Sequence, residues 1–292
     1  MKKYGMLLGI ALIWGSQFML NYWVLMVFSP VFLALMRSGI GVLTLNIVLW
    51  MLPESNKNNL LPLNYWSKIS RIAFLEASVP FILIGWGQER VESSVTAVIM
   101  ASIALFTVVW VLLFVKEERV SKARMMGIGV GFIGVLVLFL PQLLARSARD
   151  QSFWGECAIL GGAVCFSLSM VLIRKLGRVR APIHMARDIL WMATVQLGLI
   201  ALAAWLCHMP LWHQAPTLRS LLSVGVLGVF AGGIVYVLYV KLLHHAGVAF
   251  TGLTNYFVPV IGVLLGVFVL GEQLSWNIIL ALVLLIGAMI WV

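Results

Sequence analysis

Long apolar segments, separated by short polar ones, follow one another along the whole chain. A helix needs ~20 apolar residues to cross a bilayer, and ten windows of that kind can be counted. They cover residues 4–25, 30–52, 69–87, 93–115, 123–141, 154–174, 182–207, 219–240, 247–270 and 276–292. Little of the chain remains for a water-soluble domain. The pattern therefore predicts an all-α integral membrane protein with ten transmembrane helices.

The composition supports this fold class. Of the 292 residues, 62% are hydrophobic and only 10% are charged, and the mean hydropathy is +1.06. A soluble core of this size could not hide so much apolar surface. The three cysteines, Cys157, Cys165 and Cys207, lie in apolar surroundings without CxxC or metal-ligand spacing, so we interpret them as small core residues. Neither a metal site nor a cofactor is predicted.

The basic residues are distributed unevenly over the connections between the windows. If the N-terminus is inside, only Arg90, Arg146, Arg149 and Arg219 fall on the outer side. The cytoplasmic side then collects Lys2, Lys3, Lys57, Lys68, Arg71, Lys116, Arg119, Lys122, Arg124, Arg174, Lys175, Arg178, Arg180 and Lys241. Lys and Arg in short loops mark the cytoplasmic side, so both termini are predicted to be cytoplasmic. Anionic lipid headgroups suffice as partners for this net charge of +10, and no nucleic acid is required.

The chain also looks duplicated. Placing residues 102–121 under residues 256–275 aligns Glu118 with Glu272 and Ser121 with Ser275, an offset of 154 residues (272 minus 118). Pro30 and Pro182 begin the second and seventh windows in a parallel way. Five spanning helices in each half force the second half to enter the membrane upside down, as in the inverted repeats of secondary transporters. We expect a first repeat over 1–141, a connecting loop over 142–153 and a second repeat over 154–292.

Five segments carry a family resemblance: ALIWGSQF (11–18), LALMRSGIGVLTL (33–45), LLFVKEERVS (112–121), GIGVGFIGVLVL (127–138) and NYFVPVIGVLLGVFVLGEQLS (255–275). With them the chain resembles the ten-helix EamA family of the drug/metabolite transporter superfamily over its whole length. The resemblance implies export or exchange of small metabolites across a cell membrane, with the bacterial inner membrane as the expected location. The chain departs from the family at Leu105, where the family usually has a proline in helix 4.

Two prolines fall inside apolar windows. A proline has no N–H to donate, so Pro259 frees the carbonyl of Asn255 and Pro80 frees the carbonyl of Glu76. A membrane tolerates such backbone where protein or water satisfies it. Each proline is therefore a candidate kink that either lines a cavity or only shapes packing. Glu118 and Glu272 lie at helix ends, where we expect them to organise turns rather than meet substrate.

Polar groups inside the apolar windows give the candidate binding site, because a charge at the bilayer centre costs ~3 kcal/mol unless it faces protein or water. Asp188 has a second interpretation, as the structural partner of a neighbouring arginine. Amides and aromatic rings on shared helix faces complete the set, which suits an amphipathic organic solute. The candidate substrate-binding residues are Trp14, Gln17, Asn21, Arg37, Glu76, Asp188, Trp191, Tyr236, Tyr239, Asn255 and Tyr256. We expect them in a cavity bounded by helices 1, 2, 3, 6, 7, 8 and 9, with helices 5 and 10 at the periphery.

These features predict a secondary transporter that exports or exchanges small amphipathic metabolites, such as amino-acid-like compounds, by alternating access. A flippase for lipid headgroups or lipid-linked metabolites is the alternative, since the same architecture could admit a headgroup. An enzyme is not expected, because HExxH, GxSxG and DxD motifs are absent from the sequence. The expected partners are a small-molecule substrate and membrane lipids, and we expect a monomer, with a dimer as the alternative. A proton gradient coupled through Glu76 or Asp188 and facilitated exchange both remain open as energy sources.

Overall fold

The computed structural model describes residues 2–51, 63–114, 122–144, 151–176, 179–239, 241–242 and 254–291. Within these ranges the regular structure is helical, apart from one isolated bridge between Phe28 and Trp212. Seven of the described helices are long and apolar enough to cross a membrane. Three shorter apolar helices are Met125–Leu140, Phe257–Leu270 and Trp276–Ala288. The predicted class, a helical integral membrane protein, is confirmed.

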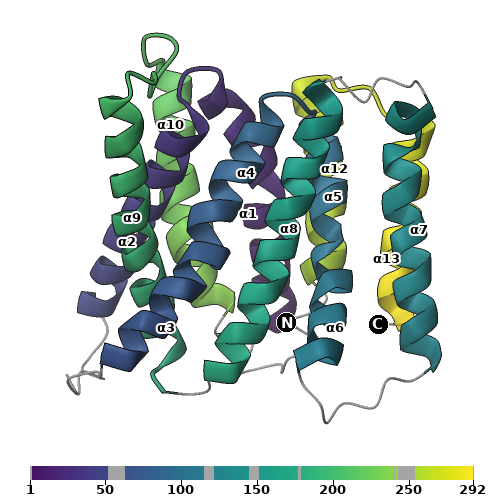
Figure 1. The fold of residues 1–292 in the computed structure, drawn as a ribbon, viewed down its shortest axis with the longest axis horizontal. Coiled ribbons are helices and arrows are strands. Elements are labelled where there is room, and N and C mark those ends of the chain that lie inside the picture. The colour runs from purple at the N-terminus through teal and green to yellow at the C-terminus, as the bar shows by residue number, and fades with distance from the viewer. Residues whose placement is uncertain are drawn as a thin grey trace.

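The helices stand side by side in a bundle, and α1 begins at the same end of it as α13 ends (Figure 1). The first-half elements are α1 (Lys2–Leu25), α2 (Pro30–Met51), α3 (Leu63–Ala73), η1 (Phe74–Ser78), α4 (Val79–Gln88), α5 (Ser93–Ala101), α6 (Ile103–Phe114) and α7 (Lys122–Leu144). The second-half elements are α8 (Gln151–Leu176), α9 (Pro182–Leu206), α10 (Leu218–Val226), η2 (Leu227–Ile234), α12 (Thr254–Leu270) and α13 (Trp276–Trp291).

Apolar side chains both fill the bundle and cover its outside. One buried cluster contains Phe18, Val98 and Leu138, and another contains Leu45 and Leu190. Many large apolar side chains remain exposed, among them Leu12, Leu43, Ile47, Leu136, Leu199, Leu202, Phe268 and Val283. An apolar outer surface of this extent is suited to lipid rather than water.

The helix contacts distinguish an edge of the bundle from its middle. The helix α7 packs mainly on α13 at one edge of the molecule, as expected for helices 5 and 10 (Figure 1). Towards the middle, α1 packs on α12, α4 on α8, and α2 on both η2 and α9. The bundle centre is therefore formed by helices from both halves of the chain.

Two spans change from α-helical to π-helical hydrogen bonding. The π-helix η1 lies between α3 and α4, and the backbone N–H of Val79 donates to the carbonyl of Phe74, five residues earlier. Pro80 follows it in the first turn of α4 and is buried. The second π-helix, η2, continues α10. π-helical turns are rare and are concentrated at functional sites, and η1 carries the candidate residue Glu76.

The fourth span, expected to be continuous over 93–115, is interrupted at Ser102. The N–H of Ser102 donates to the carbonyl of Ile99 at 3.0 Å, and its hydroxyl donates to the same carbonyl at 2.6 Å. This three-residue turn separates α5 from α6 although no proline is present. Pro259, in contrast, lies buried inside α12, which continues through it. A serine that competes for a backbone carbonyl therefore lies at this break.

The backbones of α2 and η2 approach each other closely at two glycines. A Cβ atom on Gly41 would lie 3.2 Å from the carbonyl carbon of Gly232, and one on Gly232 would lie 3.1 Å from the carbonyl oxygen of Arg37. Small residues permit this kind of contact between membrane helices. The contact holds the segment of α2 that carries Arg37 against the eighth span.

Glu272 links the end of α12 to the beginning of α5. The chain turns at Gly271, whose φ of +73° favours glycine. The two carboxylate oxygens of Glu272 then accept from the backbone N–H groups of Ser93 at 2.7 Å and Ser94 at 2.8 Å. This agrees with the expected role of Glu272 in organising a turn. Glu118, its counterpart in the first half, lies outside the described residues.

Candidate functional site

A buried arginine and a glutamine meet at the centre of the bundle. Arg37, on α2, is 8% exposed, and its Nη2 donates to the side-chain oxygen of Gln17 on α1 at 2.6 Å. The guanidinium lies over the ring of Phe81 on α4, 4.2 Å from the centroid. The expected meeting of Gln17 and Arg37 is therefore found, with Phe81 added to it.

Three aromatic residues lie beside this pair. The ring of Trp14, one turn before Gln17 on α1, is 6.5 Å from that of Tyr236 and 5.6 Å from that of Tyr239. Both tyrosines belong to the eighth span and are half-buried. Tyr236 interacts electrostatically with Arg37, so the rings and the guanidinium belong to one site.

Glu76 completes the group from the π-helix η1. Its Oε2 accepts a short hydrogen bond from the hydroxyl of Ser169 on α8, and it interacts electrostatically with Tyr236 and Tyr239. In the part of the chain that the structure describes, Glu76 has no ion-pair partner. We call Trp14, Gln17, Arg37, Glu76, Tyr236 and Tyr239 the central polar cluster.

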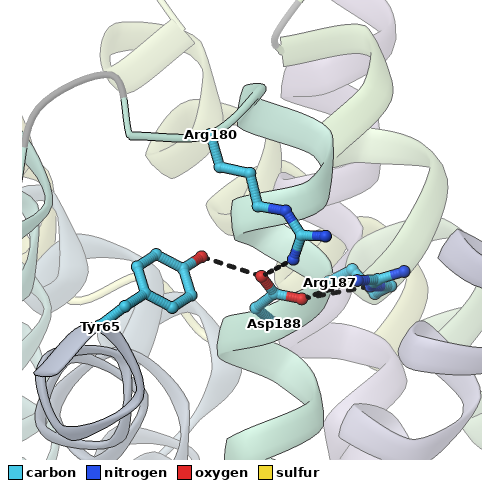
Figure 2. A network of polar contacts seen from close by, with 4 residues as sticks. All are labelled: Tyr65, Arg180, Arg187 and Asp188. Atoms are coloured by element: carbon cyan, nitrogen blue, oxygen red, sulfur yellow. Dashed lines mark hydrogen bonds and ion pairs between the residues drawn. The ribbon is translucent and has the colours of Figure 1, made fainter. Parts of the chain in front are cut away.

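Asp188 lies outside this cluster, in a network of its own (Figure 2). It is 1% exposed, and its Oδ2 accepts from the hydroxyl of Tyr65 at 2.8 Å and from Nη1 of Arg180 at 2.5 Å. Its Oδ1 accepts from Nη2 of Arg187 at 2.9 Å. Two arginines and a tyrosine therefore occupy both carboxylate oxygens. Of its two interpretations, the structural ion pair fits this geometry.

The remaining candidates are scattered. Asn21 is buried and donates to Gln88 at 2.8 Å, and Gln88 donates to the carbonyl of Phe18. Trp191 is 52% exposed, and none of the ring contacts described for the cluster involves it. Asn255 and Tyr256 lie in α12, but their side chains are outside the described part of the chain. Pro80 follows the π-helix that carries Glu76, whereas Pro259 lies next to none of the cluster residues in the contacts described.

The sequence analysis did not predict two residues that form hydrogen bonds at or near the site, Ser169 and Gln196. Ser169 gives no signal in an apolar window, because serine is common in membrane helices. Gln196 does give one, since it is an amide inside the seventh window. It accepts from the Ser78 hydroxyl at 2.7 Å and donates to the carbonyl of Ser70 at 2.9 Å. Gln196 thereby braces the span that carries η1 from α9.

An apolar bundle around a polar cluster of this kind is the architecture of a membrane transporter. The model of the EamA-like transporter family matches the chain twice, over residues 1–140 and 153–292. The chain belongs to this family, whose members are transporters and not enzymes. Both the predicted family and the predicted multi-pass membrane location are confirmed.

Several curated proteins are similar over nearly the whole chain. The uncharacterized inner membrane transporter YedA of Escherichia coli K12 is 27% identical over 99% of this chain and 90% of its own. The uncharacterized transporter YoaV of Bacillus subtilis is 22% identical, covering 96% and 92%. The S-adenosylmethionine/S-adenosylhomocysteine transporter of Chlamydia muridarum is 25% identical, covering 93% and 85%. A crystal structure with a TM-score of 0.67 and 20% identity covers 99% of this chain and 96% of its own, which supports the fold alone.

Proposed function

We propose that the protein is a secondary transporter that exports or exchanges small amphipathic metabolites, including amino-acid-like compounds, by alternating access. The central polar cluster is the observation that carries this proposal. It contains one cation, one carboxyl group, an amide and three aromatic rings from helices of both halves. Neither Arg37 nor Glu76 forms an ion pair among the described residues. Such a site can bind a solute that has both polar and apolar parts.

The named substrate of one relative supports the solute class. The Chlamydia muridarum protein is named for S-adenosylmethionine and S-adenosylhomocysteine, which are small metabolites with charged and aromatic parts. Small-molecule transport is therefore favoured over the lipid-flippase alternative. Because the cluster lies within one chain, we propose that a monomer is the working unit.

We also propose a 5+5 inverted repeat, with ten spans and both termini in the cytoplasm. The family model matches each half separately, which supports a duplication. The offset of 154 residues that aligns Glu118 with Glu272 moves η1 (74–78) to 228–232, inside η2 (227–234). A pseudo-twofold axis would also relate the contact of α2 with η2 to that of α9 with η1, and both contacts are present.

We propose Glu76 as the residue that couples transport to a proton gradient. Asp188 is held in ion pairs by Arg180 and Arg187, which occupy its carboxylate. Glu76 faces only Ser169, Tyr236 and Tyr239 among described groups. A carboxyl group without a cationic partner can change its protonation state during a transport cycle.

Transport by proteoliposomes tests this function. Uptake of radiolabelled S-adenosylmethionine and of a labelled pool of amino acids is measured with and without an imposed pH gradient. We expect Glu76→Gln to abolish the part of the uptake that depends on the pH gradient. The folded fraction of Asp188→Asn should keep this gradient-dependent uptake. Full gradient dependence in Glu76→Gln would leave facilitated exchange as the mechanism. Scrambling of a labelled lipid, with no uptake of either probe, would favour the flippase instead.

A further inference from the structure

The charge of Arg37 lacks a counterion in the part of the chain that the structure describes. The side chain is 8% exposed. Among the described residues its only hydrogen-bond acceptor is the neutral amide oxygen of Gln17, and its buried Nε has no partner there. Phe81 covers one face of the guanidinium. Asp188, in contrast, has two arginine partners.

An arginine cannot escape this cost by losing its proton, because it stays charged in proteins. A buried charge without compensation is strongly unfavourable, and it persists in proteins mainly where function requires it. Arg37 lies seven residues after the start of α2 (Pro30–Met51), about 10 Å into the helix, and its guanidinium contacts Gln17 and Phe81 inside the bundle. An anion that enters the site would supply the missing partner.

The shape and charge of the site indicate the kind of anion. A guanidinium offers its N–H groups as a planar fork that matches the two oxygens of a carboxylate. A single cation neutralises a single negative charge, and none of the described contacts of Arg37 involves a second cation. The neighbouring rings of Phe81, Trp14 and Tyr236 suit an apolar group on the same solute. A monocarboxylate therefore fits better than a doubly charged phosphate.

We propose that Arg37 binds the carboxylate of the transported solute, which takes the place of the Gln17 amide oxygen at the guanidinium. Gln17 then holds the empty fork in position between transport cycles. This inference rests on the proposed transport function and names the chemical group that the site selects.

Matched acids and amides provide the test. Unfolding midpoints of the purified full-length protein are measured with phenylacetate, hydrocinnamate, L-phenylalanine and L-leucine, and with the amide of each. The acids are expected to stabilise the protein and the amides are not. Arg37→Gln is expected to weaken acid binding by about 10- to 100-fold, as the loss of a charged hydrogen bond implies. Arg37→Lys keeps the charge but loses the planar fork. Its affinity for the acids should lie between that of the wild type and that of Arg37→Gln.

A variant at Gln17 tests the same site in case the Arg37 variants fail to fold. Gln17→Glu puts a carboxylate where the amide oxygen now accepts from Arg37 at 2.6 Å, so the fork is occupied from within. We expect this variant to unfold at a higher temperature than the wild type and to lose its response to the acids. Glu92→Gln, a change of the same size outside the central polar cluster, is the control and should keep the response.

Three results would overturn the carboxylate site: equal stabilisation by acids and amides, an undiminished response in Gln17→Glu, or no response of the wild type to either set. Counterflow of the same compounds in proteoliposomes separates this failure from that of the transport function. Equal transport of acids and amides removes only the carboxylate site. No transport of any probe, the S-adenosylmethionine and amino-acid pools included, removes the transport proposal too.

Discussion

Asp188 and Arg37 are both buried charges in apolar helices, but their surroundings differ. Arg180, Arg187 and Tyr65 satisfy Asp188, whereas Arg37 is left with one neutral acceptor. The sequence identifies both residues as unusual because a charge in an apolar window is visible directly. It does not show which of them is paired, because Tyr65 lies 123 residues from Asp188 along the chain. Only the folded bundle brings these two together.

Replacement of Asp188 should therefore affect stability more than substrate recognition. Asp188→Asn leaves two partly buried arginines without their carboxylate, and we expect a loss of about 2–4 kcal/mol in the free energy of unfolding. Tyr65→Phe, which removes one of the hydrogen bonds, should cost less. Unfolding in mixed micelles measures both. An Asp188→Asn protein that is as stable as the wild type but binds solute poorly would contradict this assignment.

Glu92, between the third and fourth spans, lowers the stability of the fold in a pH-dependent way. Loss of hydration raises the pKa of its carboxyl group, and the Glu272 carboxylate raises that pKa further. A raised pKa in the folded state means that ionised Glu92 destabilises the fold once the pH exceeds its unfolded value of about 4.3. Glu92→Gln should therefore raise the unfolding midpoint at pH 7, and the gain should vanish below about pH 4. A gain of equal size over that whole pH range would show that the charge is not its cause.

At the scale of elements, the apolar windows predict where helices lie but not where they change their hydrogen bonding. Pro80 and Pro259 are visible signals, yet α12 continues through Pro259 while the fourth span breaks at Ser102 without a proline. The serine hydroxyl competes locally for the carbonyl of Ile99, and serines elsewhere in these helices do the same without breaking them. Two of the spans also contain π-helices, which no periodicity in the sequence revealed.

The cap that Glu272 places on α5 can be tested by amide exchange. Its carboxylate satisfies the N–H groups of Ser93 and Ser94 and opposes the positive end of the helix. Glu272→Gln keeps one acceptor oxygen and loses the charge, so the fourth span should be destabilised by about 1–2 kcal/mol.

Hydrogen exchange at Ser93 and Ser94 should then quicken by about 5- to 30-fold, as this cost implies. Glu92→Gln is the matched control, because the Glu92 side chain makes no capping hydrogen bond to α5. Exchange that quickens equally in both variants would remove the special role of Glu272.

At the scale of the whole molecule, hydropathy predicted the fold class and the distribution of Lys and Arg predicts its orientation. The number of apolar segments follows from length and composition, so it is largely independent of tertiary contacts. The assembly of the central polar cluster does depend on tertiary contacts, because Gln17, Glu76 and Tyr236 come from spans that are distant in sequence. The sequence therefore predicted all six members of the cluster, but not that Asp188 has a network of partners of its own.

The predicted orientation can be measured with single cysteines. In a background with Cys157, Cys165 and Cys207 replaced by serine, Lys68→Cys should react only with reagents on the cytoplasmic side. Gln214→Cys, in the connection between α9 and α10, should react only from outside. Lys175→Cys serves as the control for the cytoplasmic end. Labelling of Lys68→Cys and Gln214→Cys from the same side would contradict the arrangement of the spans.

The matched π-helices also bear on the history of the chain. A π-helical turn holds one more residue than an α-helical turn, which is the mark left by a single inserted codon. Under the proposed 5+5 inverted repeat, two such insertions at matching places are most simply explained by one event that preceded the duplication. The ancestor would then be a five-helix polypeptide that already carried the insertion. Such an ancestor would have to enter the membrane in both orientations.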